Sequence, residues 1–253
     1  MKKVAVINDL SGFGKCSLTA AIPALSVQGV QACPLPTAVL SNQTGYPDYC
    51  SVDFTDNLPS FINQWKKLEP HFDGILTGFV SDIRQIKIIE DFCRDFKKED
   101  TVLVVDPVMA DNGKLYPAFD MDYARKNTEL CSCADMIVPN ITEACFLTGT
   151  EYREEYDRAY IDLLLERLTA LGCKNIIVHP MFLGYDLKLS AQEEWDINIE
   201  RYSQLIPAAK KYGVTVCLEN MFTGYRGKIY AACCADMADA NKYINYLNSI
   251  AGE

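Results

Sequence analysis

The stretch NDLSGFGKCSLTAA, residues 8–21, places two glycines and a lysine directly after the apolar run VAVI. Such a turn could hold a phosphate group, and a nucleotide-binding P-loop has the pattern G-x-x-x-x-G-K-S/T. Here Cys16 follows the Gly-Lys pair and offers magnesium no hydroxyl, while Asp9 occupies the place of the first glycine. The dinucleotide pattern G-x-G-x-x-G fails as well. Two interpretations remain: a flexible turn that starts a helix, or a small-molecule pocket lined by Asp9, Ser11 and backbone amides.

Four more polar stretches follow apolar, strand-like runs further along the chain. They are LSNQTGY (40–46), LTGFVSD (76–82), VVDPVMADNGKLY (104–116) and MIVPNITEACFLTG (136–149). Each could be an ordinary turn between a strand and a helix. Ligands of open α/β sheets, however, bind where the carboxyl ends of the strands meet. Together the four stretches therefore favour a pocket.

The elements that would position these stretches alternate between strands and helices. Gly29, Gly172 and Gly213 follow three of the helical segments, where a left-handed residue is favoured. Most strand runs are continuously apolar, as in parallel strands buried on both faces, so the pattern predicts an α/β fold with a mainly parallel sheet. The predicted strands are 3–7, 31–35, 74–77, 101–105, 136–138, 175–178 and 214–218, and the predicted helices are 17–28, 83–96, 158–171, 194–212 and 236–250.

The composition is typical of a globular protein without a nucleic-acid or membrane partner. The formal net charge is -10, and no basic cluster exceeds a pair of lysines. No apolar run approaches the roughly 18 residues of a membrane span, and the start is typical of a first strand rather than a signal peptide. Most of the eleven cysteines stand in apolar context, so we expect reduced thiols in a cytoplasmic protein. Cys131-Ser-Cys133 and Cys233-Cys234 lack zinc-knuckle spacing, and no structural metal is expected.

The opening stretch with Ser11, followed by SNQTGY, LTGF, DPVMAD and PNITEA, resembles the pyridoxal kinases of the ribokinase-like superfamily in order and approximate spacing. The resemblance covers about residues 1–178 and implies a ribokinase-like, three-layer α/β fold. It implies that Ser11 and Thr44 contact the ring substituents of a B6 vitamer and that Phe79 lies against the ring. Tyr116 would belong to a flexible stretch nearby. An aromatic face suits a flat heterocycle.

The same resemblance implies a nucleotide side to the site. Asp106 would lie near the phosphates and metal of MgATP, and Asn140 and Glu143, an N-x-x-E motif, would organise them partly through water. Hard carboxylate and amide oxygens suit Mg²⁺. Relatives of this kind are often dimers, so a homodimer is a further implication.

One part of the superfamily pattern is absent from the chain. The resemblance implies a catalytic aspartate in a G-T-G-D or G-A-G-D turn within the last third, where helix amides hold the transferred phosphate and the aspartate takes the hydroxyl proton. No such turn follows residue 178. LTGTEY (147–152) lies too early, and FTGYRGK (222–228) has no aspartate.

From about residue 172 the chain instead resembles the xylose-isomerase-like (β/α)₈ barrels of the sugar phosphate isomerase and epimerase group. The stretches that show this resemblance are GCKNIIVHPM and NIERYSQLIPAAKKYGVTVCLENMF. His179 and Glu219 match metal positions of that family, but two ligands are too few for a divalent site of that type. The alternatives are ordinary roles at the ends of strands.

We therefore predict a pyridoxal-kinase-like domain over 1–178 and a barrel-like βαβα fragment over 179–253, packed on the same sheet by a right-handed crossover that adds 214–218. Segments 182–193 and 222–234 are expected to be irregular. The functional hypothesis is an ATP-dependent kinase of pyridoxal, pyridoxine or pyridoxamine with impaired or no turnover. The alternatives are a non-catalytic vitamin-binding protein, a chimeric gene product without selected function, and a metal-dependent sugar isomerase.

Overall fold

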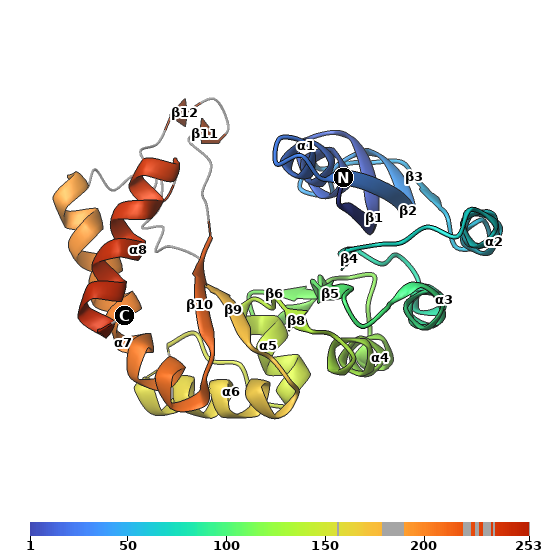
Figure 1. The fold of residues 1–253 in the computed structure, drawn as a ribbon. Helices are drawn as coiled ribbons and strands as arrows, with labels where there is room; N and C mark the ends of the chain where they lie inside the picture. The colour runs from blue at the N-terminus through green and yellow to red at the C-terminus, as the bar shows by residue number, and fades with distance from the viewer. Residues whose placement is uncertain are drawn as a thin grey trace. The chain divides into compact units, whose positions relative to one another are not determined.

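The structure, a computed structural model, divides into two compact units, Met1–Arg153 and Glu154–Glu253 (Figure 1). It describes residues 1–155, 157–178, 190–219, 224–225, 228–229, 234 and 236–252. Each unit is described by itself. The boundary predicted at residue 178 falls inside the second unit and stays a prediction.

The first unit is built on a six-stranded sheet with the order β3-β2-β1-β4-β5-β8. Its strands are parallel except β3, which runs antiparallel to β2. This confirms the predicted α/β class with a mainly parallel sheet. The strands are β1 (Lys3–Phe13), β2 (Gln31–Asn42), β3 (Ser51–Asp53), β4 (Gly74–Thr77), β5 (Val102–Val105) and β8 (Met136–Ile137).

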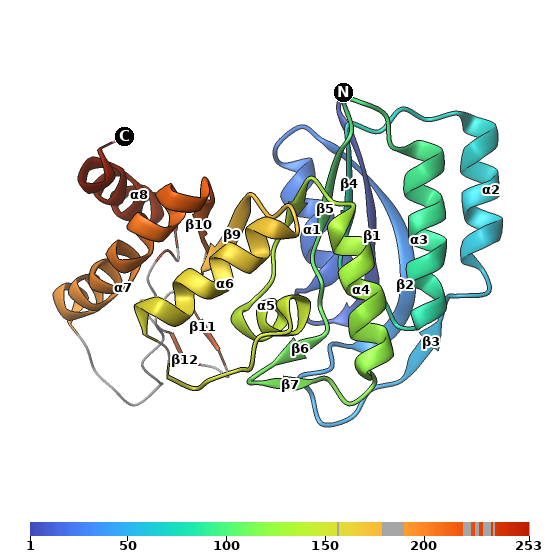
Figure 2. The same cartoon turned by 90° about the horizontal axis from the view of Figure 1, so that it is seen from below.

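Helices cover both faces of this sheet (Figure 2). Helix α1 (Ser17–Ser26) lies on one face, and α2 (Leu58–Leu68), α3 (Ile83–Phe96) and α4 (Met121–Ser132) lie on the other. The short helix α5 (Ile141–Thr148) follows β8. The core contains fully buried strand residues such as Ile75 and Leu103, and an aromatic cluster joins α2, α3 and the segment just before β4. That cluster consists of Trp65, Phe72, Phe92 and Phe96.

Strands β1 and β2 continue well beyond the predicted ranges 3–7 and 31–35. They pair with each other as far as Phe13 and Asn42. The ladder therefore supplies hydrogen-bond partners for the backbone of the largely polar residues 8–13. The register shifts once: Asn8 pairs with Pro36, but Leu10 pairs with Val39. Strand β2 therefore carries one extra residue opposite Asp9. Such bulges re-aim side chains and are frequent next to functional sites.

A small hairpin follows β5. Strands β6 (Ala110–Asp111) and β7 (Lys114–Leu115) pair antiparallel around Asn112 and Gly113. Both turn residues have positive φ, 51° and 78°, as a two-residue hairpin turn of the Asn-Gly kind requires.

The second unit contains α6 (Arg158–Ala170), β9 (Asn175–Val178), α7 (Ala191–Tyr212), β10 (Thr215–Leu218), β11 (Gly224–Tyr225), β12 (Lys228–Ile229) and α8 (Met237–Ala251). Strands β9 and β10 pair with each other in parallel, and β11 pairs with β12. In the described residues β9 and β10 form a two-stranded sheet. The expected addition of 214–218 to the first sheet stays a prediction. Trp195, Tyr202, Leu218 and Tyr243 pack together in this unit.

Local signals in the chain place several helix ends. Gly29, Gly172 and Gly213 all have positive φ, as predicted for residues that follow a helix. Helix α7 begins three residues before the predicted 194, because Ser190 and Glu193 form a reciprocal cap. The rest of the predicted irregular segment 182–193 lies outside the described residues, as does most of 222–234. None of the described helices is both long and apolar enough to cross a bilayer.

Candidate functional site

The carboxyl end of β1 carries a buried polar pair. Asp9 and Ser11 are 4% and 1% exposed, and the Ser11 hydroxyl donates to Oδ2 of Asp9 at 2.9 Å. The bulge in the β1–β2 ladder lies opposite Asp9. The predicted residue Ser11 is therefore at the sheet edge where ligands of α/β folds bind, and its hydroxyl is oriented by a carboxylate.

The loop after β4, which carries Phe79, is hydrogen-bonded to strands β1 and β2. The backbone N–H of Phe79 donates to Oδ1 of Asn8 on β1 at 2.8 Å, and the carbonyl of Phe79 accepts from the hydroxyl of Thr37 on β2 at 2.7 Å. Oδ1 of Asn8 also accepts the N–H of Asp9 at 2.9 Å. A single side-chain oxygen therefore joins the polar end of β1 to the loop that presents Phe79.

Gln85, on the first turn of α3, is hydrogen-bonded to the loop that carries Phe79 and to the segments beside it. Its fully buried side chain donates to the carbonyl of Thr37 and to the hydroxyl of Thr55, both at 2.8 Å. Its amide oxygen accepts the N–H of Ser81 at 3.0 Å. Beside it, burial tends to raise the pKa of Asp53, but hydrogen bonds from Thr55 and Ser81 outweigh that effect and lower the pKa. The loop is thus held by a satisfied polar network.

An aromatic group lies around Phe79. The ring of Phe119 is 5.9 Å from Phe79 and 6.4 Å from Tyr116, and it stacks on Tyr123 at 3.9 Å, all between ring centroids. The hydroxyl of Tyr123 donates to the carbonyl of Val80 at 3.0 Å. Two predicted residues, Phe79 and Tyr116, are therefore brought together by Phe119, which the sequence pattern did not single out.

The predicted nucleotide-side residues are also brought together. Asn140 and Glu143 form a reciprocal cap at the start of α5, with both hydrogen bonds 2.9 Å long. The other oxygen of Glu143 accepts the N–H of Met109 at 3.0 Å, and the amide of Asn140 donates to the carbonyl of Ala110 at 2.9 Å. These bonds join the DPVMAD stretch after β5 to the N-x-x-E motif.

The electrostatics of this corner are acidic. Burial raises the pKa of Glu143, although backbone N–H groups of Asn140, Met109 and Ala110 oppose the rise. Burial also raises the pKa of Tyr116, and the nearby carboxylates of Glu143, Asp111 and Asp106 add to that effect. Asp106 is half-buried at the end of β5. The field around Tyr116 would therefore favour a cation.

Both oxygens of Glu143 already accept backbone hydrogen bonds, so this carboxylate is poorly available as a direct metal ligand. No group of three or more His, Cys, Asp or Glu side chains within the described ranges is placed to hold a metal ion. The residues do not form a magnesium site made by protein alone. They fit a cation whose remaining ligands come from a phosphate group or from water.

The raised pKa of Glu143 gives a prediction for the pH dependence of stability. Because protonation of Glu143 is easier in the folded state, its contribution to the unfolding free energy is greatest below its ordinary pKa of 4.5 and is lost as the pH rises through the raised folded value. The unfolding free energy of the native chain minus that of Glu143→Gln should therefore fall as pH rises from about 4.5. Urea titrations at several pH values would measure this difference, and one that grows with pH would contradict the assignment.

Thr44 lies further out. It stands in the turn after β2 and is exposed, and nearby Phe13 and Tyr46 meet edge to face at 5.6 Å. Glu219, which follows the last residue of β10, is exposed, and its backbone N–H donates to the carbonyl of Val178 at 3.1 Å. His179 lies outside the described residues. The metal role implied for Glu219 and His179 stays a prediction.

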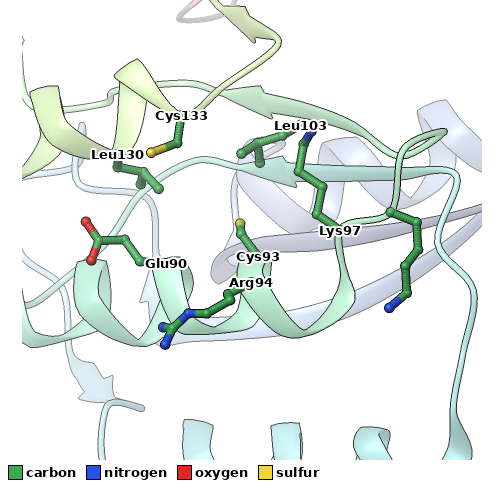
Figure 3. A pocket seen from close by; sticks show the side chains of 8 residues that line it. Glu90, Cys93, Arg94, Lys97, Leu103, Leu130 and Cys133 are labelled. Carbon is green, nitrogen blue, oxygen red and sulfur yellow. The ribbon is translucent and has the colours of Figure 1, made fainter.

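A separate pocket of about 380 Å³ lies where α3 and α4 end, beside Leu103 (Figure 3). Glu90, Cys93, Arg94 and Cys133 are among its lining residues. Burial raises the pKa of the Cys93 thiol to about 12, so this cysteine is a poor nucleophile. Leu103 stands near the beginning of β5 and Asp106 follows its end, so the pocket belongs to the opposite edge of the sheet.

Comparisons with known proteins identify a family and several relatives. A family model described as phosphomethylpyrimidine kinase matches residues 14–202. A candidate phosphomethylpyrimidine kinase from Bacteroides thetaiotaomicron, crystallised in a form with pyridoxal, is 46% identical over 68% of this chain and 60% of its own, with a TM-score of 0.66. The pyridoxal kinase of Lactobacillus plantarum is 34% identical over 68% of this chain and 62% of its own, with a TM-score of 0.63.

A curated relative, the pyridoxal kinase of Dictyostelium discoideum, is 28% identical over 185 residues, which are 71% of this chain. The chain spans about 60% of the length of the curated relatives it matches. The predicted resemblance to pyridoxal kinases and the ribokinase-like fold are confirmed by these relatives. The junction predicted at residue 178 lies inside the matched range and stays a prediction. The chain belongs to the phosphomethylpyrimidine kinase family.

Proposed function

We propose that this chain binds a B6 vitamer (pyridoxal, pyridoxine or pyridoxamine) at the carboxyl edge of its first sheet, as a pyridoxal-kinase-like protein with impaired or no phosphoryl transfer. The observation that carries the proposal is the link between a buried polar strand end and an aromatic loop. Asn8 joins Asp9 to Phe79 through one oxygen. The Bacteroides relative, which is 46% identical, was crystallised with pyridoxal, and this supports the choice of ligand.

The vitamer side of the proposed site has two parts. Phe79, backed by Phe119, supplies a flat apolar face for the pyridine ring. Ser11 and Thr44 supply hydroxyls for the ring substituents, and Tyr116 flanks the same region. Thr44 is exposed in the turn after β2, so its hydroxyl is accessible to a ligand.

On the nucleotide side, we assign Asp106, Asn140 and Glu143 to MgATP. Glu143 ties the DPVMAD stretch to α5, so its role is to shape this corner and to order water. A bound Mg²⁺ ion would supply charge neutralisation for the phosphates. The chain itself offers no aspartate in a G-T-G-D turn to take the proton from the vitamer hydroxyl. The proposed protein therefore binds its ligand without the usual means of transferring a phosphoryl group.

Calorimetric titration with pyridoxal tests the proposal. We expect saturable binding at micromolar to high micromolar ligand, and we expect Phe79→Ala to weaken it about tenfold because the ring loses its stacking face. Phe61→Ala is the matched control, since Phe61 is exposed on α2 and packs against Phe54. No heat from the folded native chain would contradict the proposal, as would equal losses in the two variants.

A further inference from the structure

The carboxylate of Asp9 has more hydrogen-bonding capacity than the protein uses. It is 4% exposed, and Ser11 donates to Oδ2. Across the part of the chain that the structure describes, no side chain or backbone donor is bonded to Oδ1. A carboxylate oxygen can only accept hydrogen bonds, so Oδ1 has room for a donor that the protein does not supply. A ligand that brings a donor to this end of β1 would therefore be stabilised by Asp9.

A buried polar atom without a partner lies on the same side of the sheet. Thr77, the last residue of β4, is 1% exposed, and its buried hydroxyl has no partner among the described residues. Ile7 pairs with Thr77 across β1 and β4, and Asp9 stands two residues beyond Ile7. Because side chains two apart on a strand share a face, Asp9 and Thr77 lie on the same face of the sheet. Two side chains at this edge, Asp9 and Thr77, can therefore make hydrogen bonds that the protein itself does not use.

Asn8 determines how this carboxylate lies relative to the ring wall. Its Oδ1 accepts the N–H groups of both Asp9 and Phe79. Its side chain also packs so closely against Gly78 that a Cβ there would lie 2.2 Å from Nδ2. Asn8 therefore fixes the position of Asp9 relative to Phe79, and Gly78 leaves the Asn8 side chain no room to move.

Resting on the proposed vitamer site, we propose that Asp9 is a specificity-determining residue that accepts a hydrogen bond from the protonated ring nitrogen, and that Asn8 is its positioning residue. The ligand class is a flat heteroaromatic ring with an N–H donor on its edge. A 3-hydroxypyridine is such a ring, because its phenol readily gives up a proton while its nitrogen gains one. A hydrogen bond between a cation and a carboxylate is among the strong ones in proteins.

The test compares pyridoxine with its deaza analogue, in which C–H replaces the ring nitrogen and the shape is kept. The native chain should bind pyridoxine about 10- to 100-fold more tightly, the ratio that a charged hydrogen bond provides. Asp9→Asn should lose most of that preference, whereas Asp100→Asn, the same change at an exposed site beside His71, should keep it. Thermal unfolding establishes that each variant is folded.

Absorption of bound pyridoxine gives a readout that a structural role would not move. In the native complex the near-ultraviolet spectrum should be that of the N-protonated ring, and in Asp9→Asn it should shift toward the neutral form. Asn8→Asp, which keeps the acceptor oxygen, should retain more of the preference than Asn8→Ala.

Each result decides between the hypotheses. Equal affinity of the native chain for the two ligands overturns the role of Asp9 but leaves the proposed function standing. A folded Asp9→Asn variant that keeps the full preference for pyridoxine over its deaza analogue also overturns the role of Asp9 and leaves the proposed function standing. A native chain that binds neither ligand overturns both.

Discussion

Pyridoxal incubated with this chain and MgATP is expected to be phosphorylated at least a few orders of magnitude more slowly than with the pyridoxal kinase of Lactobacillus plantarum. The 253 residues contain no G-T-G-D turn, and we therefore expect this chain to lack the general base and the phosphate-holding amides that the resemblance assigns to that turn. Phosphoryl transfer depends on positioning and charge stabilisation, so loss of the amides should cost more than loss of the base alone. Initial rates of phosphate-ester formation would measure the difference.

A hybrid protein supplies the positive control. Residues 1–178 of this chain, followed by the corresponding last third of the Lactobacillus enzyme, should regain turnover if the front of the site is competent. A folded but inactive hybrid would place the defect in the front as well. Turnover by the native chain at the rate of the Lactobacillus enzyme would refute the predicted impairment outright.

Replacing Gly78 by alanine should be among the most damaging single changes in the first unit. A Cβ at this position would lie 2.2 to 2.8 Å from three atoms of the Asn8 side chain. If Asn8 moves, the N–H groups of Asp9 and Phe79 both lose their acceptor. We expect a loss of about 2–3 kcal/mol in the free energy of unfolding, from overpacking and from unpaired donors. We also expect weaker pyridoxal binding, because the Phe79 loop is displaced.

Gly74, at the start of the strand that precedes Gly78, is the matched control. An added Cβ there would meet Val4 at 3.4 Å and Val102 at 3.5 Å, which is ordinary contact, so Gly74→Ala should change stability by less than about 1 kcal/mol. The double variant Asn8→Ala with Gly78→Ala should be less destabilised than the two single losses summed. Urea unfolding of the native chain, the three single variants and the double variant measures these values, and similar losses at 74 and 78 would contradict the close contact with Asn8.

Much of the fold could be predicted because its signals are local. Strand 74–77 and helix 83–96 were predicted to the residue, since an apolar run fills β4 and Asp82 caps α3. The N-x-x-E motif stands at the start of α5, where Asn140 and Glu143 cap the helix. Polar alternation hid the extension of β1, because residues 8–13 lack the continuous apolar run that marked residues 3–7 as a strand.

The parts of the site that could not be predicted depend on contacts between distant segments. Gln85 sits inside a well-predicted helix, but its role arises from bonds to Thr37 and Thr55. Asn8 matters because residue 79 reaches it across the sheet. Such partners follow from strand order, which periodicity does not determine. Phe119 had no local signal at all, since it lies in a loop between β7 and α4.

The shared oxygen of Asn8 has an evolutionary consequence. Because one amide group orients both Asp9 and Phe79, a mutation that adapts either residue to a new ligand alters the setting of the other. Substitutions at positions 9 and 79 should therefore be epistatic, and their effects should not add as those of distant sites do. Changes of preference in this lineage would then proceed through paired replacements, with position 8 as the constraint on which pairs succeed.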